Sequence, residues 1–171
     1  GLTPRPTGDP EADLLVVPVF EEEDLADEPG LDAAAAGEVS RARTRGEFKG
    51  KLFDVFTTSV GNGWKTQRAA LVGAGPRAEV STEHLRRIAI IGGLAARQRR
   101  LPRIALLHRA APGVTPEQAA QALAEGICLA NYDGASYKTE DRDRVWIERA
   151  GLRLLDGAAA DVAERVPRPV P

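Results

Sequence analysis

The sequence predicts an α/β domain of three layers, in which helices flank a mixed, mostly parallel sheet. Apolar runs typical of strands alternate with helical segments along the chain, a pattern typical of parallel sheets. Two strand segments are joined by a tight turn, which adds one antiparallel hairpin. The 171 residues, of which 43% are hydrophobic, suffice for the core of one domain.

The two N-terminal segments, residues 1–12 and 13–20, differ in composition. The first is rich in Pro and Gly without periodicity and predicts a flexible leader. The second is an apolar run rich in Val, typical of a strand buried on both faces. Pro18 lacks an amide hydrogen, so we expect it at a sheet edge or where strand pairing stops.

An acidic loop and a helix follow. Residues 21–28 are mostly acidic and precede a Pro-Gly pair, which predicts a surface loop. Four consecutive alanines then favour a helix, and three arginines near its end complement the helix dipole. We expect this helix to run from Leu31 to about Arg45.

The next segments predict an antiparallel hairpin. Residues 52–60 alternate and contain Phe, Val and Thr, which favours a strand. Residues 61–63 read Gly-Asn-Gly, a tight-turn signal, and residues 68–73 resume as a second strand. The two strands should therefore pair with each other.

Two long helices enclose a short strand. Ser81 or Thr82 should cap a helix that runs to about residue 100 with one apolar face, and residues 104–108 predict the strand. Thr115 and Gln118 flank a proline in the pattern of a capping box. The second helix should then run to about residue 132.

The C-terminal part carries weaker signals. Residues 145–147 and 152–155 predict two short strands, and residues 157–166 predict a final helix before a Pro-rich tail. We therefore expect one α/β domain over residues 13–156, with residues 157–171 forming the helix and tail.

The net charge of −2 is distributed unevenly. Residues 1–38 hold eleven acidic residues and one basic residue, whereas residues 39–109 hold fifteen basic and four acidic residues. The basic segment, residues 39–109, either binds a polyanion or forms ion pairs with the acidic segment, residues 1–38. Nineteen of the 23 basic residues are Arg, a bias that a GC-rich genome explains as well as phosphate recognition does.

The glycine-rich end of the second hairpin strand is a weak candidate for cofactor binding. Gly73 and Gly75 fit a loose form of the dinucleotide fingerprint. A nucleotide site requires that the glycine turn open directly into a helix. Pro76 intervenes and the helix starts only near Thr82, so an ordinary turn after a buried strand is favoured.

Four arginines cluster near the end of the first long helix. Such a patch could neutralise phosphates, with an affinity that falls as salt rises. Cations are also favoured at helix C-termini, and no aromatic side chain interleaves the patch to stack on bases. A solvated face or a protein interface is therefore favoured over nucleic acid. This possible basic interface consists of Arg97, Arg99, Arg100 and Arg103.

The chain offers no catalytic constellation above background. His84 and His108 lie far apart in sequence, and no Ser or Cys has an acid and a base that the sequence places beside it. We expect Cys128 to be a small buried apolar residue; as the single cysteine it favours a reducing compartment, the cytoplasm. The acidic residues 21–24 predict a solvated loop and not a metal site.

Two stretches, Gly46-Glu47-Phe48-Lys49-Gly50-Lys51 and Tyr137-Lys138-Thr139, are the most specific parts of a longer ordered pattern. Its other segments are residues 16–20, Leu31-Asp32, residues 70–75, Thr82 with Leu85 and Arg86, Ala124-Glu125-Gly126 and Tyr132. In this order they resemble the N-terminal domain of the cytosol (leucyl) aminopeptidases, over about residues 12–140.

This resemblance implies a macro-domain-like fold. In that family the domain precedes a catalytic domain that holds two divalent metals, such as Zn or Mn, and the enzyme is typically a hexamer. The metal ligands and catalytic residues lie in that second domain, around an Asn-Thr-Asp-Ala-Glu-Gly-Arg stretch that neither Asn62 nor Asn131 begins. No catalytic, cofactor or metal residue is therefore carried over to this chain.

The sequence therefore predicts a non-catalytic domain with a role in assembly, regulation or substrate access. Its partner would be a catalytic aminopeptidase domain or further copies of itself. The alternatives are a module that binds a nucleotide or an ADP-ribose-like ligand through Gly73 and Gly75, and nucleic-acid binding through the basic patch. No apolar run approaches the ~20 residues that span a bilayer, so we expect no membrane contact.

Overall fold

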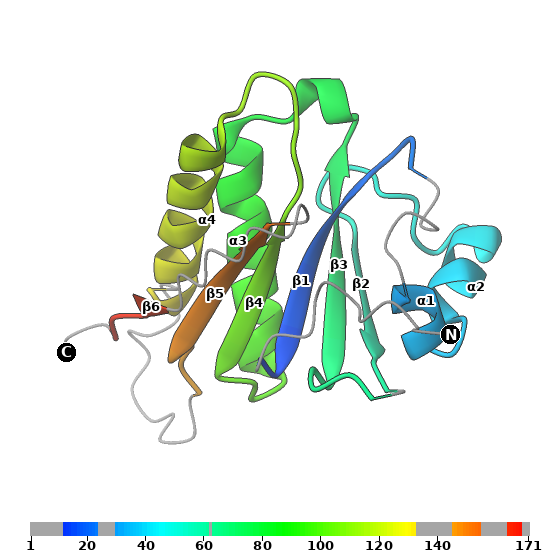
Figure 1. The fold of residues 1–171 in the computed structure, drawn as a ribbon, viewed down its shortest axis with the longest axis horizontal. Coiled ribbons are helices and arrows are strands. Elements are labelled where there is room, and N and C mark those ends of the chain that lie inside the picture. The colour runs from blue at the N-terminus through cyan, green and yellow to red at the C-terminus, as the bar shows by residue number, and fades with distance from the viewer. Residues whose placement is uncertain (1–11, 24–29, 62, 133–144, 155–163, 169–171) are drawn as a thin grey trace, which may run out of the picture.

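In the computed structural model, which describes residues 12–23, 30–61, 63–132, 145–154 and 164–168, six strands form one sheet (Figure 1). The strands are β1 (Leu14–Phe20), β2 (Val55–Ser59), β3 (Arg68–Gly75), β4 (Arg103–His108), β5 (Arg149–Leu154) and β6 (Glu164–Arg165). Their order is β2-β3-β1-β4-β5-β6. The four central strands are parallel to their neighbours, and the edge strands β2 and β6 are antiparallel, which confirms the mixed, mostly parallel sheet.

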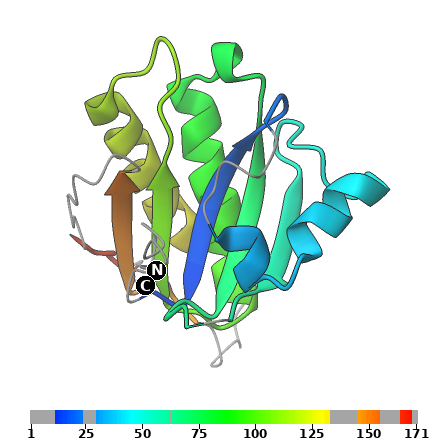
Figure 2. The same ribbon diagram turned by 45° about the vertical axis from the view of Figure 1, so that its right-hand side comes forward.

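Helices cover both faces of the sheet. The helices are α1 (Leu31–Ala34), α2 (Glu38–Arg45), α3 (Thr82–Gln98) and α4 (Pro116–Asn131), and a single 3-10 turn, η2 (Arg77–Glu79), precedes α3. Helices α3 and α4 lie side by side on one face, whereas α1 and α2 lie on the other, beside β2 and β3 (Figures 1 and 2). The predicted three layers are therefore present.

The central strand β1 supplies both cores. Leu14 and Val16 point into the apolar cluster under α3 and α4, and Leu15 and Val17 point into the cluster under α1 and α2. Because successive strand side chains face opposite ways, an unbroken apolar run is what a strand covered on both faces requires. Every residue of β1 is buried, as the run of Val and Leu predicts.

The predicted starts of α3 and α4 are confirmed, because capping hydrogen bonds between residues close in sequence fix both of them. The Ser81 side chain accepts a hydrogen bond from the amide of His84 and caps α3. Thr115 and Gln118 form both hydrogen bonds of the capping box at the start of α4. A polar side chain that satisfies free amides marks a helix start within a few residues, independently of the tertiary fold.

Three expectations about elements were wrong. The helix expected over residues 31–45 is broken at Ala36 and Gly37, whose φ angles are +54° and +77°, so α1 and α2 are separate helices. One strand, β5, replaces the two expected around Gly151, and residues 145–147 are not a strand. The end of the helix expected over residues 157–166 is the strand β6, which pairs with β5; residues 155–163 lie outside the described part.

Candidate functional site

The ends of β1 and β4 separate at the carboxyl edge of the sheet. β1 pairs with β3 along its whole length but with β4 only over Leu14–Val16. Pro18 thus lies where pairing with β4 has stopped, as predicted. The Arg109 guanidinium, directly after β4, donates to the Pro18 carbonyl at 3.0 Å. Since α/β sheets bind ligands beyond the carboxyl ends of their strands, this edge is the candidate site.

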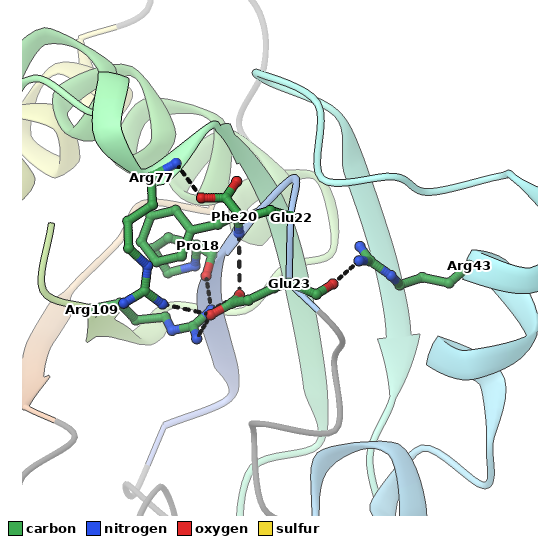
Figure 3. A network of polar contacts seen from close by, with 7 residues as sticks. All are labelled: Pro18, Phe20, Glu22, Glu23, Arg43, Arg77 and Arg109. Carbon is green, nitrogen blue, oxygen red and sulfur yellow. Dashed lines mark hydrogen bonds and ion pairs between the residues drawn. The ribbon is translucent and has the colours of Figure 1, made fainter.

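A polar cluster fills this edge (Figure 3). We call it the Glu23 cluster; it consists of Pro18, Phe20, Glu22, Glu23, Arg43, Arg77 and Arg109. The side chains of Glu23 and Arg109 are each 7% exposed, and Arg109 donates to both carboxylate oxygens of Glu23. Arg77 donates to Oε1 of the same carboxylate at 2.9 Å, and the Phe20 amide donates to Oε2 at 3.3 Å. One buried carboxylate thus receives two guanidinium groups and a backbone amide.

The surroundings of this carboxylate are aromatic and cationic. The Phe20 ring lies 4.3 Å from the guanidinium carbon of Arg77 and 5.1 Å from that of Arg109 (Figure 3). Such cation–π contacts fix the orientation of both guanidinium planes. Arg43, from α2, donates to the Glu23 carbonyl and so ties the turn after β1 to the helical layer.

The neighbouring Glu22 is exposed and holds η2 in place. Its carboxylate accepts a hydrogen bond from the Arg77 amide at 2.9 Å. This bond, together with one from the backbone amide of Glu22 itself, lowers the pKa of Glu22 below its ordinary value. Glu22 therefore stays charged at neutral pH and orders the segment that carries Arg77.

The acidic residues 21–24 were expected to form a solvated loop. Glu21 and Glu22 are exposed, as expected, but Glu23 is buried, and Asp24 lies outside the described residues. The expectation was wrong for Glu23 because its partner, Arg109, is 86 residues away in sequence. Glu23 lies three residues after the end of β1, and Arg109 lies directly after the end of its parallel neighbour β4; that placement is the signal that could have paired them.

The weak cofactor candidates Gly73 and Gly75 lie under the segment of residues 50–54. A Cβ atom on Gly73 would come within 1.8 Å of the Lys51 carbonyl oxygen, and the Gly75 amide donates to the Gly50 carbonyl at 3.1 Å. The chain itself therefore occupies the space beside Gly73 that a pyrophosphate would need. The missing Cβ of Gly73 admits this close backbone approach, and at Gly75 glycine permits the φ of +68°.

The four arginines of the possible basic interface do not point to one surface. Arg97 donates to the Val145 carbonyl at 3.2 Å, and its guanidinium lies 4.8 Å from the Trp146 ring centre. Arg99 donates to Thr57 of β2 at 2.9 Å, and Arg103 forms a two-pronged ion pair with Asp13, with its shorter contact at 2.7 Å. Arg100 follows α3 with a φ of +60°. Arg97, Arg99 and Arg103 thus bind different parts of their own chain.

The remaining candidates are also separate. The ring of His84, in the first turn of α3, packs edge-on against Phe53 at 6.0 Å, whereas His108 is buried at the end of β4. Within the described ranges no three His, Cys, Asp or Glu side chains are grouped in a way that could hold a metal ion. Cys128 is half-buried and not fully buried as expected.

Cys128 lines an apolar cavity of about 310 Å³ between α4 and the strands β4 and β5. Leu106, Leu123, Leu152 and Val166 form part of its wall. Among the described helices, none has the length and apolar character needed to cross a membrane.

Comparison with known proteins identifies the family. The profile described as "Cytosol aminopeptidase family, N-terminal domain" matches residues 16–141, more than half of the chain. A probable cytosol aminopeptidase of Syntrophotalea carbinolica is 30% identical over 165 residues, which cover 92% of this chain and 33% of that protein. A second probable cytosol aminopeptidase, from Thermosynechococcus vestitus, is 34% identical over 147 residues, which cover 81% of this chain and 29% of that protein. The chain thus spans about a third of the length of these relatives.

Solved structures show the same fold. A mutant of tomato leucine aminopeptidase superposes with a TM-score of 0.63 at 21% identity, covering 86% of this chain and 30% of that one. The macrodomain of Mycobacterium tuberculosis DarG superposes with a TM-score of 0.52 at 16% identity, and the match covers 69% of this chain and 82% of that one. The expected macro-domain-like fold is therefore confirmed. With the family profile matched and the fold shared, this chain belongs to the cytosol aminopeptidase family as its N-terminal domain.

Proposed function

We propose that this domain performs no peptidase chemistry itself and serves assembly, regulation or substrate access for a catalytic domain that holds two divalent metals. The observation that carries the proposal is the Glu23 cluster. The carboxyl edge of the sheet, where α/β folds bind ligands, is filled by an ion pair of the chain's own Glu23 and Arg109. The relatives are about three times as long as this chain, which leaves room in them for a catalytic domain.

The surface supports a role in contacts with a further domain or with other copies. Leu52, just before the edge strand β2, is 40% exposed, and Val55, the first residue of β2, is 46% exposed. Leu129 and Tyr132 are 49% and 52% exposed at the end of α4. Apolar side chains exposed on two separate elements offer area that a partner would bury. Such a partner, and a cytoplasmic location, are parts of this proposal.

The first test is enzymatic. The purified chain, incubated with Mn²⁺ or Zn²⁺ and a leucine anilide, should release no aniline product. A full-length cytosol aminopeptidase in the same buffer serves as the positive control. Metal-dependent hydrolysis by the chain alone would show that it contains its own active site and would refute the proposal.

A second candidate function is binding of an ADP-ribose-like ligand, which the structural likeness to macrodomains favours. Two contacts oppose it: the Lys51 carbonyl beside Gly73 and the Glu23 carboxylate between the ends of β1 and β4. We therefore expect calorimetry with ADP-ribose or NAD to give no binding heat at millimolar ligand. Saturable heat would favour this function over the first.

A further inference from the structure

We propose that the Glu23 cluster is a binding site for a small carboxylate, which the chain closes with its own Glu23. This inference does not depend on whether the domain hydrolyses peptides. Its basis is that Arg77, Arg109 and the Phe20 amide surround the Glu23 carboxylate as they would surround a ligand (Figure 3). A planar, two-pronged guanidinium contact is the geometry by which Arg recognises carboxylates.

The donors exceed what one carboxylate uses. Two guanidinium groups, those of Arg77 and Arg109, bind the buried carboxylate of Glu23, and a third, that of Arg43, donates to the backbone carbonyl of the same residue. Within the described part of the chain, the buried atoms Nε of Arg109 and Nη1 of Arg43 have no hydrogen-bond partner. A buried donor without an acceptor costs about 1–3 kcal/mol. An acceptor group brought by a ligand would remove this cost, whereas Glu23 in its present position does not.

The walls of the site do not depend on Glu23. Arg109 follows β4, Arg77 belongs to η2, and Phe20 ends β1, so each is positioned by sheet pairing or by a turn. Glu23 lies in the turn after β1, outside any helix or strand, so substitution of its side chain leaves the strands and the turn that carry the other donors in place. A tethered group competes at an effective concentration of at least millimolar, so a free carboxylate should bind the unaltered chain poorly.

The test removes the tethered carboxylate and supplies a free one. In Glu23→Ala, 50 mM sodium acetate at pH 7 should raise Tm by about 3 °C over sodium chloride of equal ionic strength, because a ligand that binds only the folded state stabilises it. The unaltered chain and Glu21→Ala, which removes an exposed carboxylate two residues away, should show no such difference. The double variant Glu23→Ala/Arg109→Met should lose the acetate effect.

Each other outcome contradicts the proposal. Equal Tm values in acetate and chloride for Glu23→Ala would overturn it, as would an acetate effect that survives in the double variant. Stabilisation by sodium phosphate as strong as that by acetate would overturn the assignment to carboxylates. If Glu23→Ala does not fold in chloride, circular dichroism decides: refolding in acetate supports the proposal, and an unfolded chain in both salts overturns it.

Discussion

Arg109 is the one buried arginine among the residues whose burial the structure describes. It is buried, it forms an ion pair with a buried carboxylate, and it donates to the carbonyl of Pro18. A buried ion pair gives little net stability relative to apolar residues, but breaking it leaves an uncompensated charge. Arg109 therefore matters for stability chiefly because its loss would leave the buried carboxylate of Glu23 without its main partner.

Replacing Arg109 tests this directly. We expect Arg109→Met to lower the free energy of unfolding by about 3–5 kcal/mol, because Glu23 would stay buried without its main partner. The matched control is Arg45→Met, which removes an exposed arginine that lies 3.7 Å from Glu47 and should change the free energy by about 0.5 kcal/mol or less. Urea denaturation measures both, and similar losses in the two variants would contradict the burial argument.

Asp32 gives the fold a dependence on pH. Burial opposes ionisation of Asp32 and tends to raise its pKa, but hydrogen bonds from the Ser40 hydroxyl at 2.6 Å and the Ser40 amide at 2.9 Å outweigh it and lower the pKa. A carboxyl whose pKa is lowered by folding stabilises the fold above the unfolded pKa. That stabilisation is lost as pH falls through the folded pKa.

Asp32→Asn should therefore be less stable than the unaltered chain at pH 7, by about 1 kcal/mol. The gap should be fully present well above pH 3.8, the ordinary pKa of Asp, and should narrow as pH falls below it, because the unaltered chain then loses its charged acceptor as well. Urea denaturation across this range measures the gap, and Ser40→Ala should show the same trend. A gap that stays constant with pH would mean that the charge on Asp32 contributes nothing.

At the scale of elements, helices α3 and α4 are held close by glycine. A Cβ atom on Gly126 of α4 would come within 2.2 Å of the Arg86 carbonyl oxygen and 2.6 Å of Ala89 Cβ, both in α3. Gly92 likewise lets α3 approach Val16 of β1. Helix propensity alone would favour alanine at these positions, so tertiary packing overrides it.

Gly126→Ala should lower the free energy of unfolding by about 1–3 kcal/mol, because overpacking outweighs the gain in helix propensity. The control is Gly151→Ala in β5, where among the described residues no atom lies within 4 Å of the added Cβ. This variant should stay within about 0.5 kcal/mol of the unaltered chain. Equal stability of the two variants in urea would show that α3 and α4 can move apart freely.

The elements also show what could be predicted from sequence. The start of α4 could be predicted because Thr115 and Gln118 carry both halves of a local hydrogen-bond pair. The break between α1 and α2 could not be predicted, because the four alanines favour one continuous helix. Glycine can adopt both a helical and a left-handed conformation, so Gly37 alone does not decide between one helix and two before α2 packs. Strand β5 was mislocated because its register is set by pairing with β4 and not by its own alternation.

At the scale of the whole molecule, the acidic N-terminal segment and the basic middle pair with each other. Asp13 binds Arg103 at 2.7 Å, and Glu23 binds Arg77 and Arg109. The uneven charge noted in the sequence is thus partly neutralised inside the fold. The family could be predicted from the order of short motifs, whereas these pairs could not, since about 90 residues separate Asp13 from Arg103.

Salt should therefore affect stability little. The Glu23–Arg109 pair is buried, and the acidic partners of Arg77 and Arg103 are also buried, so salt screens these pairs less than fully exposed ones. The free energy of unfolding in urea should therefore change by less than about 1 kcal/mol between 0.05 and 0.5 M NaCl. A loss of several kcal/mol would indicate that exposed charges carry most of the electrostatic stability.

The central position of β1 has a consequence for synthesis. β1 leaves the ribosome before both of its neighbours in the sheet, β3 and β4, and β4 ends only at His108. The apolar strand β1 therefore has two unpaired edges until β3 is made and one until β4 is made, and such exposed edges favour aggregation. Asp13 precedes that strand and Glu21 to Glu23 follow it, so acidic residues flank both of its ends and oppose aggregation of the nascent chain. Two of these acidic residues, Asp13 and Glu23, become buried in ion pairs once Arg103 and Arg109 have been made.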